Sequence, residues 1–395
     1  MLCLFANATW SQPSEEKSSV CDTIVVDRAA DNFVIASLLI CEPSSERFYS
    51  VFGHASIRLQ CPTFDLDYVF TYSSENLDEA FLYLAGKRMM GLMEVPTDSF
   101  IAGEFRGIRE YPMQLPPQVK TELWRVFDTH AMEGSVPYDC VRGSCARMIY
   151  SYLTEAIASV DSIRVEGPVW SEDFEMTIRE LNHKYTYESP WNGVLYSAIV
   201  GFPYIDKVDL PNAEKLVYPK LLVDVLQTTT INDVPILGSQ YEMLRVKPQI
   251  QRGWFTPIVC GIIILLLSLL SFAAPFVHNA KLTRLAEVWD IILLVVVTVI
   301  GTLMSYLVLF SHLPHTEWNW LIVPYNLLPA ILWHWRRHWT LPYSILLIIW
   351  VIAMSVYPHQ MVEPIHLLFA ISFALILIKN SNIYEKYVKK YENYY

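Results

Sequence analysis

The sequence predicts an α+β domain followed by an all-α transmembrane domain of about five helices. Most of the acidic residues in the 395-residue chain lie before residue 250, whereas the sequence after residue 254 is almost continuously apolar. The N-terminal part, residues 22–240, instead alternates between strand-like and helix-like runs. A polar domain with its own core, joined to a membrane domain, is therefore expected.

Hydrophobic patterns divide the N-terminal domain into elements. Residues 54–60 alternate polar and apolar side chains, which predicts a half-buried strand. A turn is expected at 62–65 and a returning strand at 67–72, so His54 should lie near the open end of a hairpin. Helices are expected at 76–84, 117–130, 170–181 and 191–200, and residues 212–226 lead toward the membrane linker.

Five segments are candidates for crossing a bilayer, namely 254–276, 288–311, 318–335, 339–357 and 361–378. The first has no charged residue and is long enough to span, while the last three are close to the lower limit. Pro324 and Pro329 bracket Asn326 in the third segment, which predicts a broken helix. Asn326 is therefore a candidate substrate contact, with a purely structural kink as the alternative.

Charged loops orient these segments. Lys281 and Arg284 follow the first segment, Arg336 and Arg337 follow the third, and a basic tail, 379–395, follows the fifth. The intervening loops, 312–317 and 358–360, contain no Lys or Arg. By the positive-inside rule the C-terminus is cytoplasmic and the N-terminal domain lies outside. Residues 1–11, apolar and then small, fit the end of an export signal.

The stretch around Cys145 carries the strongest chemical signal. Gly143 and Ser144 supply a turn, and apolar residues recur at helical spacing from 148 to 160. A cysteine in the first turn of a helix meets unpaired N–H groups and the positive end of the helix dipole, which favour the nucleophilic thiolate. His54 offers a partner base. We expect Cys145 to act as nucleophile and His54 as general base and acid.

Polar neighbours are expected to support this pair. Tyr72, Ser73 and Asp67, on the returning strand, are candidates for orienting the imidazole. The hairpin register favours Tyr72 or Ser73, with Asp67 farther along. Ser144, directly before the thiol, is a candidate for supporting the oxyanion.

Two arginines are candidate substrate contacts. Arg58 shares a strand face with His54, and Arg147 follows the thiol by two positions. The Arg58 guanidinium suits a phosphate or carboxylate group, and Arg147 would lower the pKa of the Cys145 thiol if it lies close to the sulfur. The alternatives are a surface ion pair for Arg58 and a solvent-facing side chain for Arg147.

Cysteine pairing leaves several possibilities open. The expected exported domain contains an odd number of cysteines, Cys21, Cys41, Cys61, Cys140 and Cys145. One free thiol is expected in an oxidising compartment if the others pair. A Cys140–Cys145 disulfide would instead remove the nucleophile. Otherwise the partner of Cys140 is open among the three earlier cysteines.

Metal and nucleic-acid chemistry are disfavoured. A zinc site would have to use His54, His130, Cys140 and Cys145, and their spacing fits no familiar zinc pattern. The net charge of −11 argues against polyanionic partners, and there is no Gly-rich phosphate loop. We therefore expect no metal, no cofactor and no nucleic acid.

Several segments together resemble a known family. They are 38–43 (LLICEP), 48–58 (FYSVFGHASIR), 67–72 (DYVFTY), 138–147 (YDCVRGSCAR), 201–206 (GFPYID) and 320–329 (WLIVPYNLLP). The family is Lnb, a bacterial lipoprotein N-acyltransferase with a periplasmic thiol domain followed by membrane helices. This chain departs from it at Ser144, where many members have Asn, and at Ser73, where Gly is usual.

The resemblance implies a fold and an activity. Histidine precedes cysteine here, the reverse of papain, as in the permuted relatives of the NlpC/P60 clan. A circularly permuted papain-like periplasmic domain is thus implied. The implied reaction moves an acyl chain from a membrane phospholipid, through a Cys145 thioester, to the α-amine of a diacylglyceryl-cysteine lipoprotein. The implied location is the bacterial inner membrane, with several crossings.

Two other functions are compatible with the sequence. One is a periplasmic cysteine amidase or peptidase that acts on cell-wall peptide, since the NlpC/P60 clan includes such enzymes. The other is a lipoprotein-binding or membrane-assembly protein in which Cys145 is structural. Replacing Cys145 separates them, because only an enzyme would lose its function.

Overall fold

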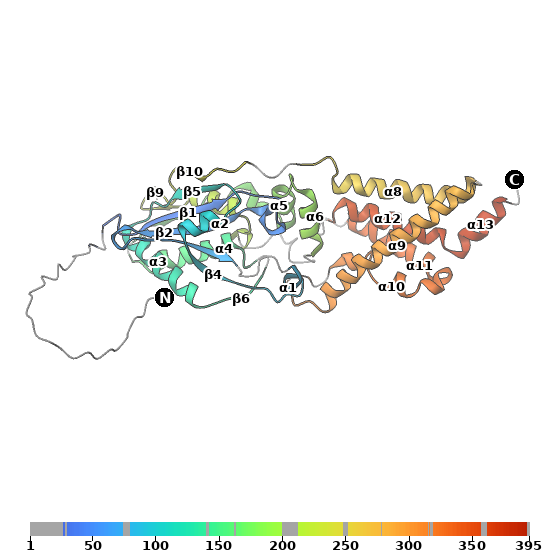
Figure 1. The fold of residues 1–395 in the computed structure, drawn as a ribbon, viewed down its shortest axis with the longest axis horizontal. Helices are drawn as coiled ribbons and strands as arrows, with labels where there is room; N and C mark the ends of the chain where they lie inside the picture. Colours follow the sequence, from blue (N-terminus) through green and yellow to red (C-terminus); the bar gives the residue numbers. More distant parts are fainter. Residues whose placement is uncertain are drawn as a thin grey trace, which may run out of the picture.

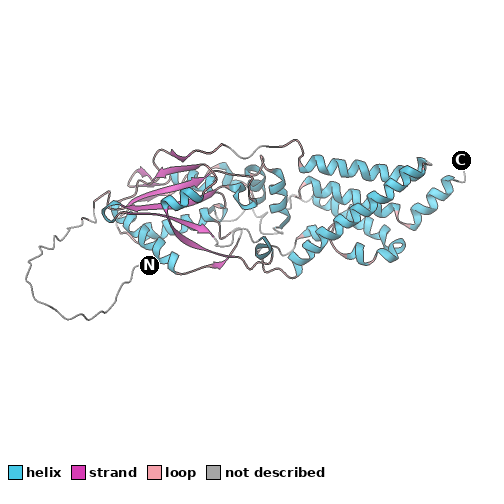
Figure 2. Cartoon of the chain, viewed as in Figure 1, coloured by secondary structure: helices cyan, strands magenta, loops and turns pink. Residues whose placement is uncertain are grey.

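The computed structural model describes residues 27, 30–73, 80–139, 142–161, 163–199, 212–247, 252–277, 279–314, 316, 319–356 and 362–392. Within these ranges the chain forms an N-terminal domain built on a sheet and a C-terminal domain of helices, placed end to end (Figure 1). Strands are confined to the first of these parts (Figure 2). The predicted division into a mixed domain and a helical domain is confirmed.

An antiparallel sheet forms the centre of the N-terminal domain, with strand order β10-β5-β1-β2-β3-β4-β6. Its strands are β1 (Ile35–Cys41), β2 (His54–Cys61), β3 (Leu66–Ser73), β4 (Met89–Pro96), β5 (Ile108–Pro112), β6 (Val136–Pro137) and β10 (Tyr241–Leu244). A small second sheet contains β7 (Val165–Glu166), β8 (Thr230–Ile231) and β9 (Val234–Pro235).

The predicted hairpin is β2 and β3, joined by a 3-10 turn at Pro62–Phe64. Ser56 pairs with Thr71 in its register. Alternation along β2 places Ala55 and Ile57 on the face that packs against helices, because successive side chains point to opposite sides of a strand. His54 and Ser56 consequently lie on the other face.

Helices cover both faces of this sheet. α3 (Pro117–Met132), α4 (Cys145–Ala158) and α7 (Pro219–Thr228) bury one face in the main core, with Phe70, Phe127 and Leu153 fully buried. α2 (Thr97–Gly103) covers the other face, where Cys41 and Val69 are buried. The predicted helix start at Cys145 is confirmed.

The remaining helices of this domain are α1 (Ala80–Leu84), α5 (Ile178–Tyr185) and α6 (Pro190–Ile199), with 3-10 turns at Phe48–Phe52, Glu172–Glu175 and Asn212–Lys215. The continuous helix expected at 170–181 is wrong. Thr177 is the N-cap of α5, with its hydroxyl accepting the N–H of Glu180 and the Glu180 carboxylate accepting the N–H of Thr177. This capping box starts a new helix.

The C-terminal domain consists of α8 (Pro257–Ala273), α9 (Ala280–Leu309), α10 (Leu328–Ile331), α11 (Arg336–Val356), α12 (Pro364–Lys379) and α13 (Asn382–Glu392). Among the described residues, Pro257–Val277, Ala280–Leu309 and Trp333–Val356 are long and apolar enough to cross a membrane. α12 and α13 reach that length only together, with a bend of 63° between them. Leu270 and Val299 are 60% and 65% exposed, as expected for side chains facing lipid. This is a membrane protein.

The third predicted span, 318–335, is broken, as its prolines indicated. It comprises a 3-10 turn at Trp320–Ile322, the short α10 and a second 3-10 turn at Trp333–Trp335. The Asn326 amide N–H donates to the carbonyls of Ile322 and Val323, and its Oδ1 accepts the Leu328 N–H. Asn326 therefore provides hydrogen-bond partners for backbone groups at the break. This is the structural role that the sequence left open as the alternative to a substrate contact.

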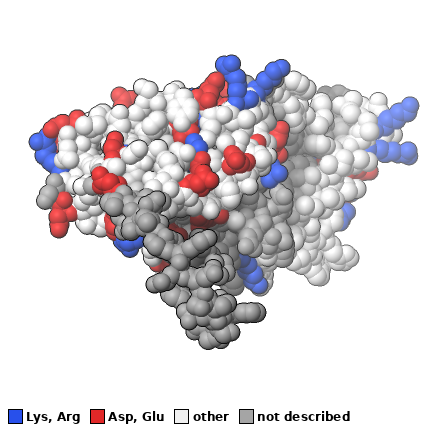
Figure 3. Space-filling model, turned by 60° about the vertical axis from the view of Figure 1, so that its left-hand side comes forward, with Lys and Arg blue, Asp and Glu red and all other residues white. Residues whose placement is uncertain are grey.

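The two domains contact each other directly. Ser311 Oγ, after α9, donates to the carbonyl of Leu84 in α1 (2.6 Å). The Asn319 amide donates to the carbonyl of Ala198 in α6 (2.7 Å). Figure 3 shows acidic side chains spread over the N-terminal domain and a largely uncharged helical domain behind it. α13 lies at the end of the molecule away from the sheet (Figure 1).

Candidate active site

The loop before α4 holds Cys145 at the helix start. Ser144 is the N-cap, and its hydroxyl accepts the N–H of Arg147 (3.3 Å) and donates to the carbonyl of Leu216 (2.9 Å). The Asp139 carbonyl accepts the N–H of Gly143 (2.9 Å). Ser144, considered from the sequence as oxyanion support, is used here to cap and anchor the helix.

The Cys145 sulfur lies among backbone donors. Packing against the core raises the pKa of the Cys145 thiol, while hydrogen bonds from the backbone of Ala55 and Ala146 and the positive charge of Arg106 act to lower it. Burial has the larger effect, so the resting group is a thiol rather than the thiolate favoured by the helix start alone. The contact with Ala55 also places the sulfur beside the residue that follows His54.

His54 begins β2, directly opposite Cys41 in β1. Gly53 has φ of +76°, and a Cβ there would lie 2.8 Å from the carbonyl oxygen of Cys41, so only glycine fits before the histidine. His54 Nε2 is 2.7 Å from Thr71 Oγ1. Ser56 donates its hydroxyl hydrogen to the same Thr71 oxygen (3.1 Å). Thr71 is thus the side chain that orients the imidazole ring.

The environment keeps His54 neutral. Burial, together with the nearby charge of Arg106, lowers the pKa of His54 to about 3, and Glu104 acts weakly in the opposite direction. A neutral imidazole keeps one nitrogen lone pair, which is what a general base requires.

A buried ion pair borders both groups. Arg106 donates from Nε and Nη2 to the two carboxylate oxygens of Glu104, each at 2.7 Å. Both side chains are less than one-tenth exposed. The charge of Arg106 acts on the pKa values of Cys41, His54 and Cys145 alike, so all of them lie near this pair.

Sequence reasoning missed Thr71, Glu104 and Arg106. Thr71 lies diagonally across the hairpin from His54, a contact that register decides. The sequence pattern that indicates the ion pair is two opposite charges, Glu104 and Arg106, between Gly103 and Gly107. A Cβ at Gly107 would lie 2.8 Å from Oε2 of Glu42, so a larger residue there would displace the end of that side chain.

The other residues considered for orienting the imidazole, Tyr72, Ser73 and Asp67, lie at two different ends of the hairpin. Tyr72 points to the helix face and borders the cysteine loop, with its hydroxyl 3.5 Å from the position of a Cβ on Gly143. Ser73 ends β3 near His54. Asp67 lies toward the opposite end of the hairpin, where it pairs with Arg58 (2.5 Å).

The two candidate arginines differ in their contacts. Arg58 is bound by Asp67 and, at 3.2 Å, by the buried carboxylate of Glu110, so its charge is already matched. Arg147 has a buried guanidinium nitrogen, Nη1, with no hydrogen-bond partner among the described residues. Of these two candidates, Arg147 is therefore the one with an unused donor.

Cys41, Cys61, Cys145 and Cys260 are free thiols. A disulfide between Cys140 and Cys145, or between Cys140 and either Cys41 or Cys61, is therefore not formed. Cys21 and Cys140 themselves lie outside the described residues. The nucleophile candidate remains available.

Comparison with known proteins assigns the membrane part of the chain. Residues 249–390 match the family model described as the Lnb transmembrane domain. No curated protein and no solved structure matches the chain. The matched region begins just before α8 and ends within α13, so it covers all the helices of the C-terminal domain. The C-terminal part of the chain is an Lnb transmembrane domain.

Proposed function

We propose that this protein is a lipoprotein N-acyltransferase of the bacterial inner membrane, with Cys145 as nucleophile and His54 as general base and acid. The proposal is supported by the Lnb transmembrane domain on the same chain as a helix-start thiol, Cys145, whose neighbour Ala55 directly follows His54 on β2. The N-terminal domain is then periplasmic and permuted papain-like. That compartment supplies no ATP or acyl-CoA, so a phospholipid ester is the fitting acyl donor.

In the first half-reaction Cys145 Sγ attacks the ester carbonyl of the phospholipid. Nε2 of His54, protonated, donates to Thr71 Oγ1, and Nδ1 takes the thiol proton. The backbone N–H groups of Ala55 and Ala146, which contact the sulfur, would stabilise the developing oxyanion. As the carbon–oxygen bond breaks, His54 returns the proton to the leaving lysophospholipid oxygen. A Cys145 thioester remains.

In the second half-reaction the α-amine of a diacylglyceryl-cysteine attacks that thioester. His54 accepts a proton from the amine, the carbon–sulfur bond breaks, and the sulfur is reprotonated. An ester and an amine are thereby converted to an alcohol and an amide, which is downhill without another energy source. The unused Arg147 nitrogen suits the phosphate of the donor.

Mass spectrometry of one lipoprotein's N-terminal peptide tests this function in cells lacking the gene. Complementation with the wild-type gene should restore an N-acyl chain, and Cys145→Ala should not. Cys61→Ala is the matched control, because Cys61 is a free buried thiol at the other end of β2. Equal acylation with wild type and Cys145→Ala would remove Cys145 from the mechanism. No dependence on the gene would favour a cell-wall amidase.

A further inference from the structure

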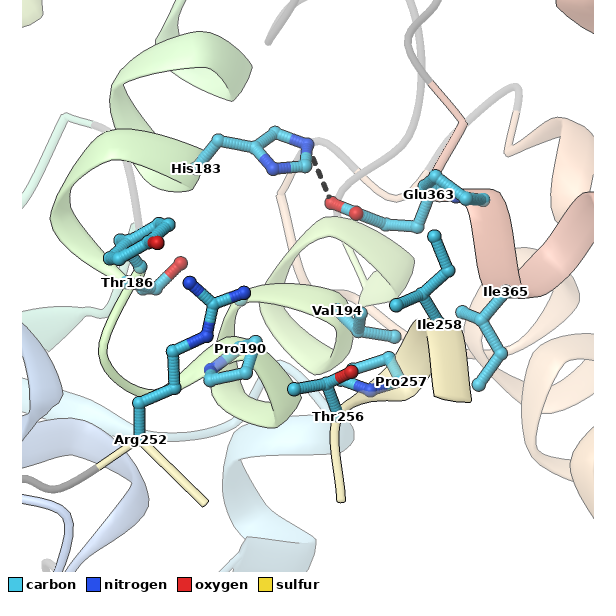
Figure 4. Close-up of a pocket in the computed structure, with 13 residues that line it drawn as sticks. His183, Thr186, Pro190, Val194, Arg252, Thr256, Pro257, Ile258, Glu363 and Ile365 are labelled. Atoms are coloured by element: carbon cyan, nitrogen blue, oxygen red, sulfur yellow. Dashed lines mark ion pairs between the residues drawn. The ribbon is translucent and has the colours of Figure 1, made fainter. Parts of the chain in front are cut away.

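A cavity of about 240 Å³ lies where the N-terminal domain meets the helical domain. Its walls come from α5, α6 and the first residues of α8 and α12, and include His183, Arg252, Thr256, Ile258, Glu363 and Ile365 (Figure 4). Cys145 and His54 are not among the lining residues. This volume equals about eight water molecules in the liquid, enough for a small polar group.

Arg252 supplies a cation to this cavity. Its guanidinium lies 4.1 Å from the centre of the Tyr187 ring and points into the space drawn in Figure 4. Within the described ranges Arg252 has no carboxylate partner, unlike Arg245 of the same linker, which pairs with Glu242. A cation held by an aromatic ring, with its donors unused, is a ready partner for an anion.

The carboxylate of Glu363 lies on the opposite wall. It is 2.8 Å from His183 Nε2, and its side chain is only 7% exposed. Its hydrogen bond raises the pKa of His183. The contact with His183 is made by Oε1 of Glu363, so the other carboxylate oxygen, Oε2, is the atom left to accept a further hydrogen bond. The cavity therefore offers separate partners for a negative and a positive group.

Two long helices begin at the cavity wall. α8 starts at Pro257 and α12 at Pro364, and both residues line the cavity. The Glu363 side chain forms no cap hydrogen bond with α12. Thr256 accepts the Val259 N–H at the start of α8 (3.5 Å), so what the two helices add to the charge of Arg252 is chiefly the positive ends of their dipoles.

Aromatic side chains place the cavity at the membrane surface. Trp254, next but one to Arg252, is 82% exposed. Trp191 stacks on Phe255, and its indole N–H donates to the Phe255 carbonyl (2.8 Å). Such aromatic groups gather at the level of lipid headgroups. From there the exposed side chain of Ile258 continues the apolar surface of α8 toward the bilayer core.

We propose that this cavity binds the headgroup of a glycerophospholipid that carries both a phosphate and a primary ammonium group. The phosphate contacts Arg252 and the N-termini of α8 and α12, the ammonium group contacts Glu363, and the acyl chains lie along Ile258 and Ile365. The site extends the proposed function by locating where lipid is held at the domain junction. Its occupancy requires no acyl transfer, so it stands or fails independently of Cys145.

Native mass spectrometry of the full chain tests the site in the Cys145→Ala background, where no turnover is possible. The purified protein is titrated with phosphatidylethanolamine. Arg252→Gln should weaken retention about tenfold, the loss expected for one charge-assisted hydrogen bond. Arg245→Gln, in the same linker but outside the cavity, should bind as the parent does. Equal binding by Arg252→Gln and its parent would overturn the proposal.

Ligand variation identifies the headgroup. Phosphatidylcholine, which has no ammonium N–H, should bind more weakly than phosphatidylethanolamine, and Glu363→Gln should abolish that difference. Equal retention of diacylglycerol would exclude a headgroup site. Full competition by free phosphoethanolamine at the same concentration would indicate a soluble phosphate ester instead of a lipid, and would also overturn the proposal.

Discussion

The surroundings of Cys145 shift the pKa of its thiol in opposite directions, and the balance determines how the thiol can be activated. Burial raises the pKa of its thiol, whereas backbone donors and Arg106 act to lower it. At the same time burial lowers the pKa of His54 to about 3. Both groups are consequently neutral at rest, and in the proposed mechanism the proton moves to His54 during the attack. This differs from a preformed thiolate–imidazolium pair.

Thr71 is the residue whose replacement should report on ring orientation. Thr71→Val removes the hydrogen bond to His54 Nε2 with little change in volume. We expect kcat to fall about tenfold, as for the loss of one neutral hydrogen bond, with KM for lipid nearly unchanged. Thr71→Ser should restore most of the rate. An unchanged kcat in Thr71→Val would mean that another group orients the ring.

The pKa of His54 also predicts how stability depends on pH. Folding lowers this pKa from 6.5 to about 3, so between these pH values the unfolded chain binds a proton that the folded chain does not. The contribution of neutral His54 to the free energy of unfolding is fully present above pH 6.5 and is lost as pH falls toward 3. Between pH 6.5 and 5 the loss is about 2 kcal/mol.

Denaturant unfolding of the full chain in detergent at pH 7 and pH 5 measures this effect. His54→Gln should lose less stability than wild type over that interval, because glutamine does not titrate. His338→Gln, which removes a histidine from an exposed position, is the matched control. Parallel pH curves for wild type and His54→Gln would contradict a neutral, buried His54.

Among the elements, the hairpin and the nucleophile helix were predictable because each has a clear local period. Alternation over 54–60 and the turn at 62–65 predict β2 and β3, and the spacing after Cys145 predicts α4. The partner of His54 was not predictable in this way. Strand period determines which face a side chain takes, so Tyr72 lies on the face opposite His54, and the diagonal neighbour Thr71 makes the contact.

In the membrane domain, apolar length predicted the helices but not their polar contacts. Segments 254–276, 288–311, 339–357 and 361–378 coincide with α8, α9, α11 and α12 to within a few residues at most ends. The contacts of Asn326 depend on how close α9 approaches. Gly301 allows this, since a Cβ there would lie 2.7 Å from the Asn326 carbonyl. Packing between segments distant in sequence is not encoded in a local pattern.

A buried polar cluster joins three membrane helices. Lys379 Nζ, at the end of α12, lies 2.8 Å from Asp290 Oδ2 in α9 and donates to Ser271 Oγ in α8 (2.9 Å). Ser271 donates to the other Asp290 oxygen (2.6 Å). Both charged side chains are about one-tenth exposed. Each of the three side chains is a hydrogen-bond or ion-pair partner of the other two, so the cluster fixes the relative positions of these helices.

Lys379→Met should be strongly destabilising, because it leaves the Asp290 carboxylate buried without its cation. We expect a loss of about 3–5 kcal/mol in the free energy of unfolding, measured in detergent. The double variant Asp290→Asn with Lys379→Met should recover part of this loss. Lys389→Met, which removes an exposed i,i+4 pair with Glu385, should cost far less, because solvent screens this pair. Equal losses for Lys379→Met and Lys389→Met would contradict a structural cluster.

At the scale of the whole molecule, direct contacts between the domains hold the thiol domain at one end of the helices. α1 binds the loop after α9, and α6 binds the segment before the broken span. Both proposed substrates are membrane lipids or lipid-anchored, so a thiol domain fixed to the bilayer surface meets both without releasing either. A single helix would be sufficient for a simple anchor, whereas here several helices share a buried core.

The most direct test of the central claim is the covalent intermediate itself. Purified full-length protein is incubated with phospholipid vesicles without a lipoprotein acceptor, and the peptide containing Cys145 is analysed by mass spectrometry. We expect one acyl chain in place of the thiol hydrogen, released by hydroxylamine and absent from Cys145→Ala. An unmodified Cys145 in a preparation that still acylates lipoprotein would contradict the central claim.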